Sequence, residues 1–201
     1  MDPAVIVLGA PGSGTGYVAS RVAHAGVDMG MGGIDARRMD HPHFVEMTSL
    51  ALEAAGWRRD HPAACGDVAV LPSGARLSSE GRWGWKGSGA ARLARKWLEL
   101  YPGVPVLCVR RHPTASAFSY WRRKHYKRPG KYPSQLAAYL LDALQIRDEL
   151  QKARRDPWLD VDYSSLGGCS ERVSEFLGAG VTFSGFSPPD ASLWREIERW
   201  A

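Results

Sequence analysis

The chain has 201 residues, a length that fits one domain, so we expect a single domain over residues 1–201. Hydrophobic residues make up 44% of the sequence and charged residues 23%, which excludes a disordered tail protein or a collagen-like fibre, and the apolar stretches are too short to predict a membrane span. The net charge is +5, but residues 122–131 hold six Lys or Arg residues and no acid, so the rest of the chain sums to −1. This basic patch favours an anionic ligand or nucleic acid, although a solvated helix end has the same composition.

Hydrophobic periodicity and the Gly and Pro positions predict an alternation of strands and helices. The predicted elements, in chain order, are a strand over 5–8, a helix over 17–25, a helix over 43–55, an irregular stretch over 58–82, a strand over 83–86, a helix over 90–101, a strand over 104–109, a helix with Pro113 at its first position, a helix over 134–153, a strand over 158–161 and a helix over 171–177. Such alternation predicts an α/β fold with three α/β/α layers around a central parallel sheet, similar to that of the P-loop NTPases.

The cysteine content and the amino terminus bear on location. The three cysteines, Cys65, Cys108 and Cys169, cannot all pair and lack the spacing of a metal site, so we expect a reducing compartment and a cytoplasmic protein. Cys108 lies in an apolar run and is predicted to be a buried small hydrophobic residue. Met1-Asp2-Pro3 leads directly into the first apolar run, so no secretory signal is expected.

A glycine-rich loop, Gly9-Ala10-Pro11-Gly12-Ser13-Gly14-Thr15-Gly16-Tyr17, joins the first predicted strand to the first predicted helix. Backbone N–H groups at a helix N-terminus bind anions, and glycine lets the chain approach a phosphate closely. The plain alternative is a strand-to-helix turn that binds nothing. The loop nearly matches the Walker A pattern, but Thr15 stands in place of the lysine and Gly16 in place of the magnesium-binding hydroxyl, so the tail of ATP is a poor match.

A second anion-binding element follows the strand over 104–109. Arg111 is expected at the carboxyl end of this strand, where open α/β sheets bind ligands, and Ser119 lies about two helical turns further on. A guanidinium group and a hydroxyl group placed in this way can bind one phosphate group, for which arginine is well suited. A structural salt bridge is the alternative role of Arg111.

Together these elements resemble the sulfotransferases that use 3′-phosphoadenosine 5′-phosphosulfate (PAPS). The phosphosulfate-loop pattern G-x-P-[RK]-S-G-T is matched at Gly9, Pro11, Ser13, Gly14 and Thr15, and the 3′-phosphate pattern R-x-P-x-x-x-x-x-S at Arg111, Pro113 and Ser119. The segment Trp83-Gly84-Trp85-Lys86 resembles the family's W-x-x-K element, whose lysine faces the sulfuryl group. The segments around Tyr163 and Phe176 resemble its Y-E-D-L and F-L-G pieces, so the family's motifs occur in the family's order.

The resemblance implies roles for individual residues in PAPS binding. Loop residues would bind the 5′-phosphosulfate, namely Gly12, Ser13, Gly14, Thr15 and Gly16. Tyr17 would stack on adenine, Arg111 and Ser119 would hold the 3′-phosphate, and Tyr163 would line the nucleotide site. Sulfuryl transfer depends on in-line positioning and on cations near the leaving oxygen, so no metal is expected. Gly12 departs from the family pattern, which has a basic residue there, so Lys86 would stabilise the leaving group alone.

A general base is also needed to take the proton of the acceptor hydroxyl or amine. Residues 39–46 resemble the acidic stretch that supplies the base in bacterial and glycan-modifying members, and Asp40 takes the family's glutamate position. His41 is the second candidate, since its ordinary pKa suits the task. In the cytosolic branch the base lies two residues after the lysine, where this chain has Ser88.

The sequence therefore predicts a PAPS-dependent sulfotransferase acting on a small-molecule or glycan acceptor, anionic if the basic patch contacts it, with 3′-phosphoadenosine 5′-phosphate (PAP) as product. Neither the acceptor nor the oligomeric state follows from the sequence. A P-loop kinase of small molecules is a rival interpretation, which the missing lysine disfavours. A non-catalytic protein that binds a nucleotide or, through its basic helix, nucleic acid is another, and nucleic acid is the less expected partner.

Overall fold

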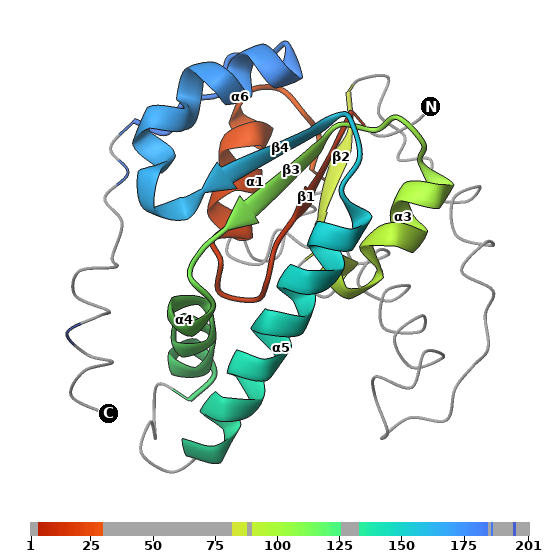
Figure 1. Cartoon of the computed structure of the whole chain (residues 1–201). Coiled ribbons are helices and arrows are strands. Elements are labelled where there is room, and N and C mark those ends of the chain that lie inside the picture. The colour runs from red at the N-terminus through yellow and green to blue at the C-terminus, as the bar shows by residue number, and fades with distance from the viewer. Residues whose placement is uncertain are drawn as a thin grey trace.

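The computed structural model describes residues 4–29, 82–87, 90–125, 133–184, 186 and 195. Their strands form one sheet in the order β2-β1-β3-β4, with every pairing parallel (Figure 1). The strands are β1 (Val5–Leu8), β2 (Gly84–Gly87), β3 (Val106–Arg110) and β4 (Trp158–Asp162). All four predicted strands are confirmed within two residues of their bounds. The strand β3 begins late because the amide of Val104 donates to Tyr101 and Pro105 has no N–H to donate.

The helices also agree with the predictions where the structure describes them. They are α1 (Thr15–His24), the 3₁₀ turn η2 (Ala90–Leu93) with α3 (Ala94–Leu100), α4 (Pro113–His125), α5 (Pro133–Ala153), the 3₁₀ segment η4 (Tyr163–Cys169) and α6 (Ser170–Leu177). Three details differ: α1 begins two residues early, the helix predicted over 90–101 starts as a 3₁₀ turn, and η4 was not predicted. The helix predicted over 43–55 lies outside the described residues.

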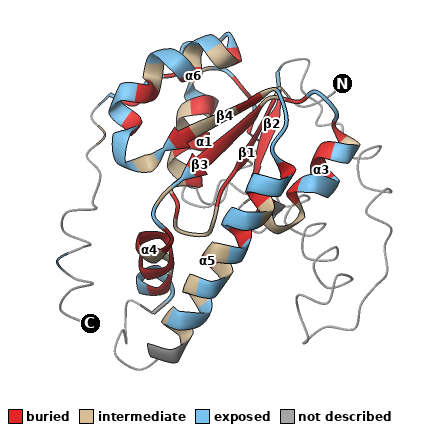
Figure 2. Ribbon diagram, in the orientation of Figure 1, coloured by how far each residue is buried: buried red, intermediate tan, exposed pale blue. Residues whose placement is uncertain are grey.

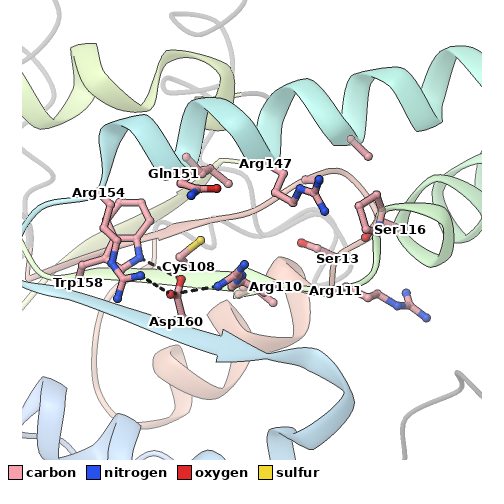
Figure 3. Close-up of a pocket in the computed structure, with 15 residues that line it drawn as sticks. Ser13, Cys108, Arg110, Arg111, Ser116, Arg147, Gln151, Arg154, Trp158 and Asp160 are labelled. Atoms are coloured by element: carbon pink, nitrogen blue, oxygen red, sulfur yellow. Dashed lines mark hydrogen bonds and ion pairs between the residues drawn. The ribbon is translucent and has the colours of Figure 1, made fainter.

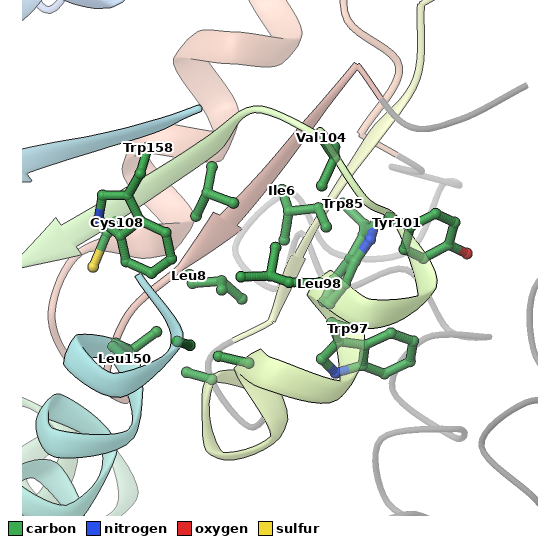
Figure 4. Packing of buried hydrophobic residues seen from close by; sticks show 14 of the residues in the cluster. Ile6, Leu8, Trp85, Trp97, Leu98, Tyr101, Val104, Cys108, Leu150 and Trp158 are labelled. Atoms are coloured by element: carbon green, nitrogen blue, oxygen red, sulfur yellow. The ribbon is translucent and has the colours of Figure 1, made fainter. Parts of the chain in front are cut away.

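One face of the sheet is covered by α3 and α5. Alternate strand residues point to this face and pack among helical side chains (Figure 4). Its core includes fully buried aromatic rings, with Trp85 of β2 and Trp97 of α3 in edge-to-face contact at 4.9 Å. From α5 it takes Ile146, Leu150 and Ala153.

The other face is covered by α1 and α6. The remaining strand residues, including Val5, Val7 and Leu107, pack against Val18 and Val22 of α1 and against Val173 and Leu177 of α6. Figure 2 shows the strands buried in red between the two helical layers. Because both faces are covered, the central strands β1 and β3 are apolar runs, Val5–Leu8 and residues 106–109, rather than alternating ones. The described residues therefore form the predicted three-layer α/β/α fold around a parallel sheet.

The long connection from β3 to β4 is a pair of helices. Pro113 is the first residue of α4, as predicted, because its missing N–H costs nothing at a helix start. Phe118 and Trp121 of α4 pack on Leu136 and Tyr139 of α5. This small separate core fixes α4 against the beginning of α5, and the rest of α5 covers the sheet.

We expect Trp85→Ala to lower the free energy of unfolding by about 3–5 kcal/mol, because it removes a fully buried ring and leaves a cavity in the core. Urea denaturation followed by circular dichroism measures the change. Leu141→Ala is the matched control, since that side chain is 62% exposed and its loss should change stability by less than about 0.5 kcal/mol. Equal effects of the two substitutions would contradict this assignment of the core.

Candidate functional site

The candidate site lies at the edge of the sheet where all four strands end. The loop after β1 leads into α1, Arg111 follows β3, and Tyr163 follows β4. Register places these ends side by side, since Leu8 pairs with both Gly87 of β2 and Cys108 of β3, and Arg110 pairs with Asp162 of β4. The parallel sheet thus brings together motifs that are far apart in the sequence.

Two glycines of the loop have left-handed backbone conformations and no room for a side chain. Gly12 has a φ of 85°, and a Cβ there would lie 2.1 Å from the carbonyl oxygen of Ser116 in α4. Gly14 precedes α1 with a φ of 100°, and a Cβ there would lie 2.1 Å from the ring of Tyr163. The amides of Tyr17 and Val18 both donate to the carbonyl oxygen of Gly14. Helix starts of this kind leave their earliest amides without an acceptor within the helix, which is the arrangement that binds anions in many proteins.

Arg111 fastens this loop to the ends of β3 and β4. Its Nη1 donates a hydrogen bond of 2.8 Å to the carbonyl oxygen of Gly12. Its guanidinium carbon lies 4.6 Å from the centre of the Tyr163 ring, within the range of a cation–π contact. The side chain of Arg111 therefore holds a positive charge between the glycine loop and an aromatic ring, as a site for an anionic aromatic ligand requires.

An aromatic cluster extends from this point toward α1. Phe186 lies between the two tyrosines, with ring-centre distances of 4.9 Å to Tyr17 and 5.0 Å to Tyr163. Tyr17 also contacts Phe183, and the guanidinium of Arg21 lies over its ring at 5.8 Å. The predicted nucleotide residues Tyr17 and Tyr163 are thus brought to one cluster, although they are 146 positions apart in the sequence.

Of the remaining predicted residues, two lie within the described part of the chain and the others do not. Ser119 lies on the part of α4 that Gly12 packs against, between Ser116 and Tyr120. Lys86 lies near the end of β2, pairs with Val7 in register and is only 7% exposed. Asp40 and His41, the predicted bases, and Ser88 lie outside the described residues.

A pocket opens on the α5 side of the same edge, with a cavity volume of about 140 Å³ (Figure 3). Ser13 of the loop, Ser116 of α4 and Arg147 of α5 line one end of it, and Arg154 and Asp160 line the other. Asp160 accepts from Arg110 at 3.4 Å and from Arg154 at 3.2 Å. Arg110 and Arg111 are consecutive and both line the pocket, but Arg110 pairs with Asp160, whereas the guanidinium of Arg111 lies over the ring of Tyr163.

Cys108 lines the pocket but is not a nucleophile. Burial and then the neighbouring Asp160 carboxylate raise the pKa of its thiol to about 12. A thiol with such a pKa stays protonated near neutral pH and has little reactivity. Cys108 is therefore a neutral wall of the pocket, as predicted from the apolar run that contains it.

Sequence reasoning missed two groups of residues at this edge. Phe186 bridges the two tyrosines, and the only signal was the pair of aromatic residues that follows α6. The pocket residues of α5 were missed as well, although Ala143, Arg147 and Leu150 recur at helical spacing and so share one face of the helix, with Arg154 directly after its end.

Metal and membrane features are not found in the part of the chain that the structure describes. It contains no group of three or more His, Cys, Asp or Glu side chains arranged to hold a metal ion. None of its helices combines the length and hydropathy of a membrane crossing.

The fold is similar to that of a solved sulfotransferase. The sulfotransferase domain from the Synechococcus PCC 7002 olefin synthase superposes with a TM-score of 0.56 and 18% sequence identity, over 91% of this chain and 74% of that chain. No protein-family model and no curated protein sequence matches this chain. The similarity shows that the chain has a sulfotransferase fold.

We expect Gly14→Ala to destabilise the protein more than Gly103→Ala does. Both glycines have a positive φ, which costs an L-residue about 1–2 kcal/mol. Only at Gly14 would the new Cβ also meet a ring, that of Tyr163, whereas the space around Gly103 is open. Chemical denaturation measures both. The double variant Gly14→Ala/Tyr163→Ala should recover part of the excess loss, and strictly additive effects would contradict the contact.

We also expect Cys108 to make stability fall at alkaline pH. Its folded pKa of about 12 lies above its ordinary value of 9.0, so between these values the unfolded chain releases a proton that the folded chain keeps. From pH 8 to pH 10 the wild-type protein should lose about 1 kcal/mol more than Cys108→Ala does. Denaturation curves at the two pH values test this, and parallel losses in both proteins would contradict the raised pKa.

Proposed function

We propose that the protein is a PAPS-dependent sulfotransferase that moves a sulfuryl group to a hydroxyl or amine of its acceptor. The observation that carries the proposal is the convergence of the glycine loop, Arg111 and Tyr163 at one edge of a sheet with a sulfotransferase fold. The order of the sequence motifs supports the same donor.

The residues present fit this donor in three respects. The loop keeps Gly12 and Gly14 where a Cβ would collide with α4 or Tyr163, which leaves backbone amides to face an anion. Arg111 supplies a guanidinium group, which together with the Ser119 hydroxyl would hold the 3′-phosphate. Tyr17 and Tyr163 belong to one aromatic cluster, which would hold the adenine ring.

The residue types at the end of the loop separate this donor from ATP. A phosphoryl-transfer loop has a lysine for the β- and γ-phosphates and a hydroxyl for magnesium, and this chain has Thr15 and Gly16 at those positions. A phosphosulfate needs the amide cradle but neither of those groups. The loop is therefore better suited to the 5′-phosphosulfate, with Ser13, Gly14, Thr15 and Gly16 around it.

Bound PAPS supplies an activated sulfuryl group, whose sulfur forms a bond to the acceptor oxygen or nitrogen as its bond to the 5′-phosphate oxygen breaks. Lys86 would stabilise the negative charge that develops on that oxygen, and its burial between β1 and the covering layers strengthens such an interaction. Asp40 would accept the proton of the acceptor, with His41 as the other candidate. The proton and the charge thus go to separate residues, and PAP is the product.

The exposed basic residues of α4 bear on the class of acceptor. Arg122, Arg123 and Lys124 are exposed on α4, the helix that also carries Ser119. Their charge favours a small-molecule or glycan acceptor that is anionic, and it also attracts the donor. We propose a cytoplasmic location on the cysteine content, since free thiols such as Cys108 and Cys169 suit a reducing compartment.

We expect PAP to bind and Arg111→Ala to weaken its binding. Losing hydrogen bonds between a charged side chain and a phosphate costs about 1.5–3 kcal/mol, or roughly 10- to 100-fold in affinity. Arg110→Ala is the matched control, because the neighbouring side chain points to the α5 pocket and should leave PAP affinity nearly unchanged. Isothermal titration calorimetry measures both.

The same titrations test the rival functions. Binding of ATP with magnesium but not of PAP would contradict the proposal and favour a kinase. Binding of PAP without sulfuryl transfer from PAPS to any of a panel of acceptors would favour a non-catalytic nucleotide-binding protein. Equal losses in Arg111→Ala and Arg110→Ala would show that only net charge matters at this edge.

A further inference from the structure

The pocket on the α5 side of the sheet edge contains groups that the proposed function does not use, Ser116 and Arg147, next to Ser13, which it does use. Its walls include two serine hydroxyls that are nearly inaccessible to solvent, since Ser13 and Ser116 are each 1% exposed. Within the described residues, neither Oγ has a hydrogen-bond partner. A buried hydroxyl without a partner costs free energy, so these two groups are suited to a ligand in the pocket.

The charges around the pocket identify what the ligand carries. Four arginines line it, Arg110, Arg111, Arg147 and Arg154, and Asp160 is the only acid among its lining residues. That carboxylate pairs with Arg110 and Arg154, whereas Arg147 has no acidic partner among the described residues. Arg147 extends from α5 toward the end of the pocket that holds Ser13 and Ser116 (Figure 3). One unneutralised guanidinium beside two hydroxyl donors is a set of groups for an oxyanion.

The rest of the wall is apolar. Ala143 and Leu150 of α5, Val109 of β3 and Trp158 of β4 line the pocket, and Cys108 adds a thiol that stays neutral. An inorganic ion would leave these side chains uncovered, whereas an organic anion would cover them with its apolar part. Pockets for small molecules commonly combine an apolar lining with a few polar groups that orient the ligand.

We propose that this pocket binds a small organic oxyanion, with the anionic group on Arg147, Ser13 and Ser116 and the apolar part against Leu150 and Trp158. The pocket adjoins the proposed PAP site and shares Ser13 and Arg111 with it, whereas Arg147 and Ser116 have no role in that site. It does not depend on the proposed function.

Benzoate and phenyl phosphate are suitable probes, with benzyl alcohol as the neutral control, and calorimetry without PAP leaves Ser13 available to them. We expect both anions to bind in the millimolar range or better, and benzyl alcohol to bind at least about tenfold more weakly, since charged hydrogen bonds contribute most here. Binding of one anion alone would support the site and identify the carboxylate or the phosphate as its preferred group. Equal binding of the alcohol, or no binding of either anion at 10 mM, would overturn the proposal.

Variants of single residues locate the binding. Arg147→Gln should weaken anion binding about tenfold or more, while Arg155→Gln removes the same charge from an exposed residue outside the pocket and should have little effect. Ser116→Ala should weaken binding but leave the melting temperature of the ligand-free protein unchanged or higher, because it removes an unsatisfied buried hydroxyl. A fall in that temperature with unchanged anion affinity would show a structural role and contradict the proposal.

Measuring both PAP affinity and anion affinity in each arginine variant distinguishes the two binding sites. Arg147→Gln should keep the PAP affinity of the wild-type protein, and Arg111→Ala should lower the anion affinity less than Arg147→Gln does, because Arg111 lines the pocket but is also engaged by Gly12 and Tyr163. Failure of PAP to bind would leave the anion site testable, because the probes are titrated into the wild-type protein and Arg147→Gln without PAP. An effect of Arg111→Ala on anion binding as large as that of Arg147→Gln would place the anion in the glycine loop instead.

Discussion

The parallel register around β1 is the constraint on which the rest of the structure depends. The strand β1 pairs with β2 on one side and β3 on the other, so the glycine loop that follows it leaves the middle of the sheet with a strand end on each side. Lys86 is brought to one flank of the loop and Arg111 to the other. A shift of one residue in either pairing would turn these side chains to the opposite face, and the continuous burial of both faces opposes such a shift.

Close packing then decides how the loop is used. The ring of Tyr163 and the backbone of α4 lie so close to Gly14 and Gly12 that only glycine fits at either position. The hydrogen bond from Arg111 to the carbonyl of Gly12 links the same loop to β3. The loop is therefore held by contacts from three elements before any ligand binds. Because it is already ordered, it loses less conformational entropy when a ligand binds.

Much of this could be predicted from the sequence because the signals were local. Pro113 marks the start of α4, Gly178 in its left-handed conformation ends α6, and short apolar runs mark the central strands β1 and β3. The 3₁₀ segment after β4 was not predicted, since it depends on the Asp162 side chain, which accepts from the amide of Ser164. Long-range contacts such as that of Phe186 with Tyr17 and Tyr163 have no local signal beyond the aromatic residue types themselves.

The pair Arg110-Arg111 shows why the site needed the structure. From residue type alone, the two arginines are equivalent candidates for binding one anion. Only the match of Arg111 to the 3′-phosphate pattern R-x-P-x-x-x-x-x-S distinguished them. In the structure each has its own surroundings, since Arg110 pairs with Asp160 and Arg111 stacks on Tyr163 and bonds to the loop. The Asp160 carboxylate offsets the charge of Arg110, which lowers the repulsion between the two neighbouring guanidinium groups. The strand end therefore places one guanidinium in an ion pair and a second between the glycine loop and Tyr163, and both line the α5 pocket.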